Sequence, residues 1–240
     1  NVSKFENKFK KYTNSKECVA VDSGTAALHL ALNITDIKKK EVLVPSLTFA
    51  STIHAIKYNG GIPIFVDVKP DTLCIDPVDL EKKITNKSKV ILPVHFGGYP
   101  CDMNSLKKIS KKKNLTIVED AAHACGSKYN GKRVGSLGDM TCFSFHPVKN
   151  LSMPKGGAIT INKKSKVLKN KLNSLRWCGI SNRKKYSYDI TELGFNYYMD
   201  EISAGIGIEQ LKKLEKLNKI RFNIAKRYEK EIKILEKIPL

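Results

Sequence analysis

The sequence is poor in arginine, and this shortage bears on its high positive charge. It carries 43 Lys and Arg residues against 23 Asp and Glu, for a formal net charge of +20, yet only 5 of these cations are Arg. Surfaces that read phosphates and bases rely on the planar guanidinium fork. The lysines are also spread along the chain without interleaved aromatic residues. The charge therefore favours solvated Lys-rich faces over a nucleic-acid interface.

Long apolar runs and closely spaced metal ligands are also lacking. No stretch of about 18 uncharged apolar residues occurs, so we expect no transmembrane helix. The first twenty residues are polar and charged, which does not fit a signal peptide. The 6 Cys residues form no C-x-x-C pair and the 5 His residues form no H-x-x-x-H pair, so we expect free thiols, no metal site and a cytoplasmic location.

Short apolar runs that alternate with amphipathic segments indicate an α/β fold. Strands are expected at 19–22, 42–45, 63–67, 90–94, 115–119, 140–145 and 158–162, and helices at 25–33, 51–58, 78–84 and 103–113. The strand runs are apolar on both sides, as in sheets covered by helices on both faces. We therefore predict a mainly parallel seven-stranded sheet sandwiched by helices. Only a loop separates the last two strands, which leaves an antiparallel direction open for one of them.

A different pattern follows residue 198. Apolar residues recur at three- and four-residue intervals, which predicts one long helix or two with a bend; the stripe comprises Ile202, Ile206, Gln210, Leu214, Leu217, Ile220, Ile224, Tyr228 and Leu235. We expect it to pack against the main domain or a partner subunit, although a coiled-coil seam or a cofactor-facing surface would share the pattern. The predicted division is residues 1–197 and 198–240. Both ends resemble cuts in a longer protein.

Three polar clusters follow predicted strands, where parallel α/β sheets bind ligands. Residues 22–25, Asp-Ser-Gly-Thr, join a strand to a helix and form either a phosphate cradle or an ordinary N-cap. Asp120 ends another strand and either caps the next helix or pairs with a buried cation. Lys149 lies in a loop after a third strand, where it is either solvated or a Schiff-base nucleophile.

Taken together, the three clusters match the functional groups by which one cofactor is bound. A phosphate anchor, an Asp for a pyridinium nitrogen and a Lys for an aldehyde are what pyridoxal 5'-phosphate (PLP) requires. Seven motifs then carry a resemblance: S-G-T-A-A-L at 23–28, V-P-S-L-T-F at 44–49, F-V-D-V at 65–68, P-V-H-F-G-G at 93–98, E-D-A-A-H-A-C-G-S at 119–127, F-S-F-H-P-V-K-N at 143–150 and G-F-N-Y-Y-M-D-E-I at 194–202. Residues 5–234 thereby resemble the DegT/StrS family of PLP-dependent sugar aminotransferases, which have fold type I.

The resemblance implies a role for each matching residue. Lys149 matches the lysine that forms a Schiff base with PLP and moves the proton, and Asp120 matches the carboxylate that keeps the pyridine nitrogen protonated. His123 matches a position beside the ring, and Phe49 the aromatic residue that stacks on it. The phosphate ligands match Gly24, Thr25 and Ser144, and Asn196 matches a residue that reaches the phosphate of the neighbouring subunit. The roles of His95 and His146 are left open.

The resemblance also implies an activity. A PLP-dependent sugar dehydratase branch of the family has His at the lysine position, so Lys149 indicates transamination. The implied reaction moves an amino group from glutamate to a keto group of a nucleotide-linked deoxysugar, for surface polysaccharide or amino-sugar biosynthesis. The implied assembly is a homodimer with shared active sites, and neither nucleic acid nor a membrane is an expected partner.

The chain departs from the family pattern in three respects. The usual G-E-G-G reads Pro154-Lys155-Gly156-Gly157, so that a base replaces an acid, and the Arg of the usual N-Y-R-M is Tyr198. The family's small C-terminal domain is absent from these 240 residues. A PLP-binding regulator or an inactive truncated homologue is therefore an alternative function, and a basic nucleic-acid binder is a third hypothesis.

Overall fold

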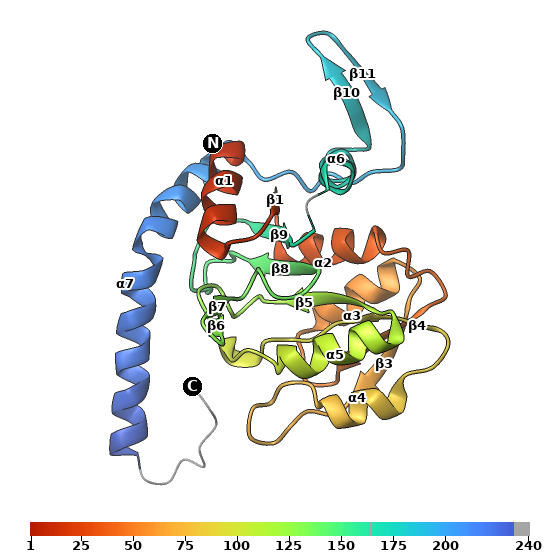
Figure 1. Ribbon diagram of the computed structural model, residues 1–240. Helices are drawn as coiled ribbons and strands as arrows, with labels where there is room; N and C mark the ends of the chain where they lie inside the picture. Colours follow the sequence, from red (N-terminus) through yellow and green to blue (C-terminus); the bar gives the residue numbers. More distant parts are fainter. Residues whose placement is uncertain (164, 233–240) are drawn as a thin grey trace.

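The computed structural model describes residues 1–163 and 165–232. A seven-stranded sheet forms its centre, and helices cover both faces (Figure 1). The strands of this sheet are β1 (Glu17–Val21), β2 (Glu41–Pro45), β3 (Ile62–Val66), β4 (Ser88–Ile91), β5 (Thr116–Asp120), β8 (Met140–Ser144) and β9 (Gly157–Ile161). The helices are α1 (Val2–Thr13), α2 (Gly24–Asn33), α3 (Ala50–Tyr58), α4 (Pro77–Lys83), α5 (Met103–Lys113), α6 (Lys166–Leu175) and α7 (Glu201–Glu231), with a short 3-10 turn η1 (Phe96–Gly98).

The strand order is β1-β9-β8-β5-β4-β2-β3. Four pairs are parallel (β2 with β3, β2 with β4, β4 with β5, and β5 with β8), whereas β9 runs antiparallel to both β1 and β8. Only the loop at 145–156 joins β8 to β9; it contains no helix, and the chain reverses direction across it. The predicted mainly parallel seven-stranded sheet is thus confirmed, with one antiparallel strand.

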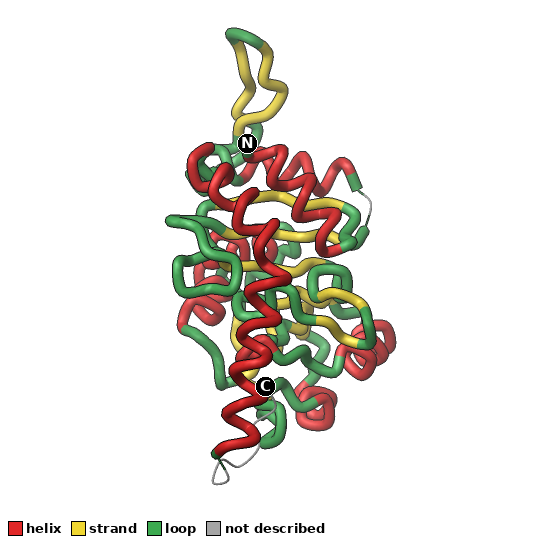
Figure 2. The backbone as a smooth tube through the Cα atoms, turned by 90° about the vertical axis from the view of Figure 1, so that its left-hand side faces the viewer, coloured by secondary structure: helices red, strands yellow, loops and turns green. Residues whose placement is uncertain are grey.

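The two faces of the sheet build two separate apolar cores, and β1 shows why. Val19 and Val21 belong to the core that includes residues of α2, α3 and α6, whereas Cys18 and Ala20 belong to the core that includes residues of α1, α4, α5 and α7. Figure 2 shows the strands as a yellow stack with helices on either side and α7 in front. Because both faces are buried, the strands need apolar side chains at every position, as the sequence pattern predicted.

Helix α7 lies along one side of the molecule and packs its first turns against α1 (Figure 1). Its buried residues are mostly small: Ser203, Ala204, Gly207, Ile208 and Leu214. Of the two predicted partners of the apolar stripe, the main domain covers only a small part of it, and packing against a partner subunit stays a prediction. Leu214 is buried, but the side chains of Ile202, Ile206, Ile220, Ile224 and Tyr228 are exposed, because the helix turns its small residues inward; Leu235 lies outside the described residues.

Two ribbons lie outside the main sheet. The strands β6 (Lys128–Tyr129) and β7 (Lys132–Arg133) form a short hairpin, and β10 (Ile180–Lys184) and β11 (Ser187–Ile190) form a longer one that projects from the body beyond α6 (Figure 1). All six Cys residues are free thiols, as predicted, and Cys178 is the exposed one. None of the helices in residues 1–163 and 165–232 is long and apolar enough to cross a membrane. The division at residue 197 stays a prediction.

Candidate active site

A cavity of about 610 Å³ opens where β1, β5 and β8 end. Seven of the eight predicted site residues line it: Gly24, Thr25, Phe49, Asp120, His123, Ser144 and Lys149. They come from the start of α2, the start of α3, the end of β5 and the segment after β8. The parallel topology explains this gathering, since parallel strands present their carboxyl ends at one edge of the sheet.

The beginning of α2 forms one wall of the cavity. Ser23 is the N-cap, and its hydroxyl oxygen accepts a hydrogen bond from the backbone N–H of Ala26 at 3.1 Å. The N–H groups of Gly24 and Thr25 precede the first intrahelical donor and have no acceptor among the described residues. These two donors and the positive end of the helix dipole can attract an anion.

Gly24 is required here by space. A Cβ atom at this position would lie 2.7 Å from the Cβ of Ser144, so only glycine lets α2 begin this close to the end of β8. Gly157 is equally constrained, because its Cβ would lie 2.8 Å from the backbone nitrogen of Gly24. The close approach places the Ser144 hydroxyl beside the free N–H groups of α2. Helix donors and a hydroxyl thus converge on one small volume.

Asp120 ends β5 and is the buried acid of the cavity, with 5% of its surface exposed. Its Oδ2 accepts a hydrogen bond from the hydroxyl of Thr52 at 2.8 Å, and its Oδ1 accepts one from the N–H of Ala122 at 3.1 Å. Both donors are uncharged. A buried carboxylate with only neutral partners favours a cationic ligand group nearby.

Lys149 supplies the amine of the cavity. Its backbone N–H donates to the carbonyl of His146 at 2.8 Å, which tightens the loop that carries it. Partial burial lowers the pKa of Lys149 below its usual value, while the charge of Asp120 opposes that shift. The pKa of His123 is also lowered, first by burial and then by the charge of Lys149. A neutral amine is therefore more accessible at Lys149 than on a solvated lysine.

The remaining predicted residues differ in how they are placed. Phe49 precedes α3 and is 76% exposed, so one face of its ring is free at the mouth of the cavity. Asn196 is exposed and forms a bridge to Trp177 outside the cavity wall, so the structure does not bring it together with the other seven.

The two histidines of open role have different environments. His95 is buried: its Nδ1 accepts the backbone N–H of Cys101 at 3.1 Å, so its Nε2 carries the proton and donates to Glu119 at 2.8 Å. Glu119 also accepts from Gly138 and Thr141, each at 2.6 Å, so this network supports the strand ends. His146 is exposed at the cavity.

The two residues that depart from the expected family motifs, Lys155 and Tyr198, lie in different parts of the structure. Lys155 lines the cavity and forms an ion pair with Asp22 at 2.9 Å. Tyr198 lies outside the cavity wall, where its ring packs edge-on against Trp177 at 4.5 Å and lies 5.1 Å from the guanidinium of Arg176. Sequence reasoning missed the pairing of Asp22 with Lys155 and the contact of Thr52 with Asp120, because no local pattern links residues this far apart.

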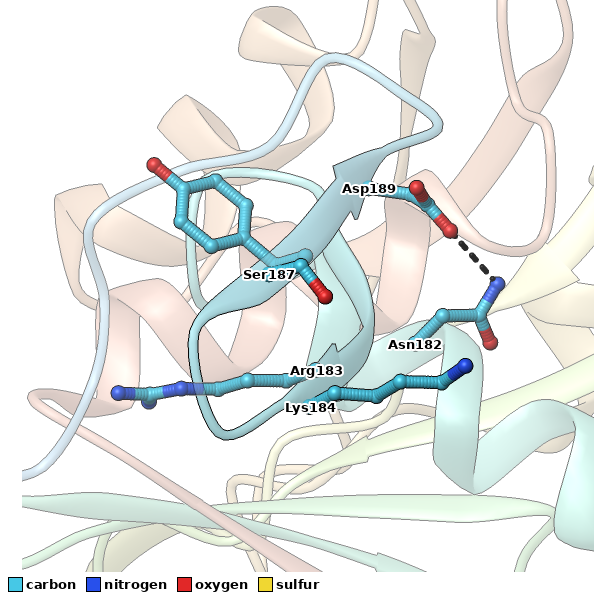
Figure 3. A pocket seen from close by; sticks show the side chains of 6 residues that line it. Asn182, Arg183, Lys184, Ser187 and Asp189 are labelled. Carbon is cyan, nitrogen blue, oxygen red and sulfur yellow. Dashed lines mark hydrogen bonds between the residues drawn. The ribbon is translucent and has the colours of Figure 1, made fainter.

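A second cavity lies on the β10–β11 ribbon and holds none of the predicted residues. Figure 3 shows its wall, in which Asn182 donates a hydrogen bond to Asp189 at 3.1 Å and the cations Arg183 and Lys184 extend from the strand. Its lining is confined to the hairpin itself. The first cavity is the candidate active site, since it alone of the two combines an amine, a buried carboxylate and a helix N-terminus.

Known proteins match this chain over nearly its whole length. The uncharacterized protein MJ1066 of Methanocaldococcus jannaschii is 42% identical, over 97% of this chain and 62% of that protein. The GDP-perosamine synthase of Escherichia coli O157:H7 is 40% identical, over 99% of this chain and 64% of that enzyme. The chain thus spans somewhat less than two thirds of the length of these relatives.

Solved structures give the same result. Spr1654 of Streptococcus pneumoniae, a protein assigned as a sugar aminotransferase, superimposes in its apo form with a TM-score of 0.92 at 32% identity, over 95% of this chain and 63% of that one. Its structures include a PLP form and a PMP form. The model of the DegT/DnrJ/EryC1/StrS aminotransferase family matches residues 1–240. On the fold, the cavity and these matches, the chain belongs to the DegT/DnrJ/EryC1/StrS aminotransferase family.

Proposed function

We propose that this chain binds PLP and is the cofactor-binding part of a sugar-nucleotide aminotransferase. The reaction moves an amino group from glutamate to a keto group of a nucleotide-linked deoxysugar, for surface polysaccharide or amino-sugar biosynthesis. The observation that carries the proposal is the meeting of Lys149, Asp120 and the free N-terminus of α2 in one cavity. The family match and the GDP-perosamine synthase relative support the class of substrate.

The residues of the cavity fit the cofactor. The N–H groups of Gly24 and Thr25 and the Ser144 hydroxyl would hold the phosphate, and Asp120, whose two hydrogen-bond donors are neutral, would hold the protonated ring nitrogen. Phe49 offers an exposed ring for stacking, and His123 would lie beside the cofactor ring. When bound, the cofactor supplies the electron sink for amino-group chemistry.

Lys149 is the residue that moves protons in this proposal. Its lowered pKa makes the neutral Nζ available, so that Lys149 would hold the carbonyl end of the cofactor and would take a proton from the α-carbon of the amino donor. His123, whose pKa is also lowered, stays neutral near pH 7 and acts as a hydrogen-bond partner. Asp120 would hold a positive charge on the cofactor ring.

The proposed assembly is a cytoplasmic homodimer. Asn196 is exposed and lies away from its own cavity, which leaves it available to the site of a second subunit. Neither nucleic acid nor a membrane is part of the proposed function.

Spectroscopy of the purified chain tests the proposal. Addition of PLP is expected to produce a visible absorbance band that glutamate bleaches. Lys149→Ala is expected to abolish the band, and the matched change at an exposed lysine, Lys163→Ala, to retain it. A correctly folded protein that stays colourless with PLP would contradict the proposal. Keto-sugar nucleotides supplied with glutamate then separate an enzyme from a PLP-binding regulator, which would give the band without amino transfer.

A further inference from the structure

An ion pair in the cavity wall joins the loop that carries Lys149 to the end of β1. The Nζ of Lys155 lies 2.9 Å from Oδ2 of Asp22, and both residues line the cavity. The two backbones also meet beside this pair, since Ser23 forms an isolated parallel β-bridge with Gly156. The pair therefore lies directly beside the start of α2.

Asp22 is fixed in this position by its other contacts. Its Oδ1 accepts a hydrogen bond from the Ser23 hydroxyl at 3.0 Å, and its backbone N–H donates to the carbonyl of Tyr197 at 2.8 Å. Only 16% of the Asp22 side chain is exposed. A carboxylate held this close to a helix N-terminus is attracted to the same positive end that would bind a phosphate, and it repels a second anion there.

Lys155 is the cation that offsets this repulsion. The hydrogen bond and the charge of Asp22 raise the pKa of Lys155, so the ammonium form is retained over the whole neutral range. An acid at position 155 would instead face Asp22 with a like charge. The positive charge of Lys155 is thus matched to Asp22.

We propose that Lys155 is a positioning residue that neutralises Asp22 and thereby allows the N-terminus of α2 to bind a phosphate group. It acts through Asp22 and does not itself hold the phosphate. The inference rests on the proposed function, because the phosphate in question is that of the cofactor. Lys155 would then be as necessary for phosphate affinity in this chain as Gly24 is for the shape of the site.

Two probes and three variants test this role on protein freed of cofactor. PLP and pyridoxal, which lacks the phosphate, are titrated by absorbance into the parent chain, Lys155→Met, Asp22→Asn and the double variant, each checked for folding by circular dichroism. At low salt, Lys155→Met is expected to bind PLP about tenfold more weakly than the parent, since it leaves Asp22 uncompensated. The double variant is expected to recover to within roughly threefold of the parent, because the repelling charge is gone.

The remaining outcomes are equally decisive. Pyridoxal is expected to bind all four proteins with the same affinity. Added salt is expected to reduce the difference in PLP affinity between Lys155→Met and the parent. If the double variant binds PLP as weakly as Lys155→Met, Lys155 contacts the phosphate itself and the inference is wrong. An equal loss for pyridoxal would show that the pair only holds the loop, which also overturns it. If the parent chain binds no PLP, the proposed function fails and the inference with it.

Discussion

Two lysines of the same cavity have pKa values shifted in opposite directions. Burial lowers the pKa of Lys149, whereas the hydrogen bond to Asp22 raises that of Lys155. Competitive acetylation across a pH series, read by mass spectrometry, is expected to label Lys149 at lower pH than Lys155. Asp22→Asn is expected to lower the labelling midpoint of Lys155 and to leave Lys149 unchanged. If the two amines were acetylated over the same pH range, the opposite pKa shifts of Lys149 and Lys155 would be contradicted.

Thr52 is a buried residue whose hydroxyl serves Asp120. The Thr52 hydroxyl donates to Oδ2 of Asp120 at 2.8 Å, and the Thr48 hydroxyl lies 2.7 Å from the Thr52 hydroxyl. Thr52→Val keeps the shape but removes the donor, which is expected to cost about 1–2 kcal/mol in the free energy of unfolding and to weaken PLP binding. Thr52→Ser is expected to restore both, as measured by denaturant unfolding and absorbance titration. If Thr52→Val and Thr52→Ser had the same unfolding free energy and the same PLP affinity, the role of Thr52 would be packing alone.

At this scale the sequence predicted what lies next to strand ends. Gly24, Asp120 and Lys149 each follow or end a recognisable strand, so local patterns were enough to place them in one cavity. The contacts of Thr52 with Asp120 and of Asp22 with Lys155 join residues far apart in the chain. Such pairs depend on sheet order, which short patterns do not specify.

Among the elements, α7 offers a matched pair of glycines. A Cβ at Gly205 would meet only Asn1, 3.6 Å away, whereas one at Gly207 would lie 3.1 Å from the ring of Phe5 and closer still to Met153. Gly205→Ala is therefore expected to stabilise the protein by about 0.5–1 kcal/mol through helix propensity. Gly207→Ala is expected to destabilise it by roughly 1–3 kcal/mol through overpacking. Thermal unfolding of both variants measures the difference, and equal shifts would contradict this packing.

The first turn of α7 is capped by an acid. Asp200 accepts from the backbone N–H of Ser203 at 2.7 Å and from its hydroxyl at 2.6 Å, and these bonds lower the pKa of Asp200. A lowered pKa means that the stabilisation is present above the unfolded value near 4 and is lost as the pH falls. Asp200→Ala is expected to cost about 1 kcal/mol at pH 7, and the difference should shrink in acid. A pH-independent difference in denaturant unfolding would contradict the cap.

Element prediction succeeded where apolar runs were short and continuous and failed where packing decides. The seven strands and helices α2 to α5 lie within a few residues of their predicted ranges. The β10–β11 ribbon was not foreseen, since its strands are exposed and carry no core pattern. The contact of α7 with the main domain was not located beyond Leu214, because the helix packs there through Ala204 and Gly207, which a search for large apolar residues overlooks.

The charge of the whole molecule gives a further expectation. A formal charge of +20, built mostly from lysines, allows weak and sequence-independent attraction to polyanions. Fluorescence anisotropy with a short duplex is expected to give dissociation constants of about 1–100 μM at physiological salt, the range of non-specific binding, with a steep loss as salt rises. Nanomolar binding that persists at physiological salt would instead favour a nucleic-acid function.

The position of β1 has a consequence for how the chain is made. Within residues 1–163 and 165–232, β1 pairs in the main sheet with β9 alone, so residues 17–21 must wait for residues 157–161 before they gain this strand partner. A ribosome adds roughly 5–20 residues per second, so this interval lasts on the order of ten seconds. During it β1 has no strand beside it, whereas α2 can already pack against α3, β5 and β8. The start of α2 is therefore tied to the sheet through β1 only after the segment that carries Lys149 has been made.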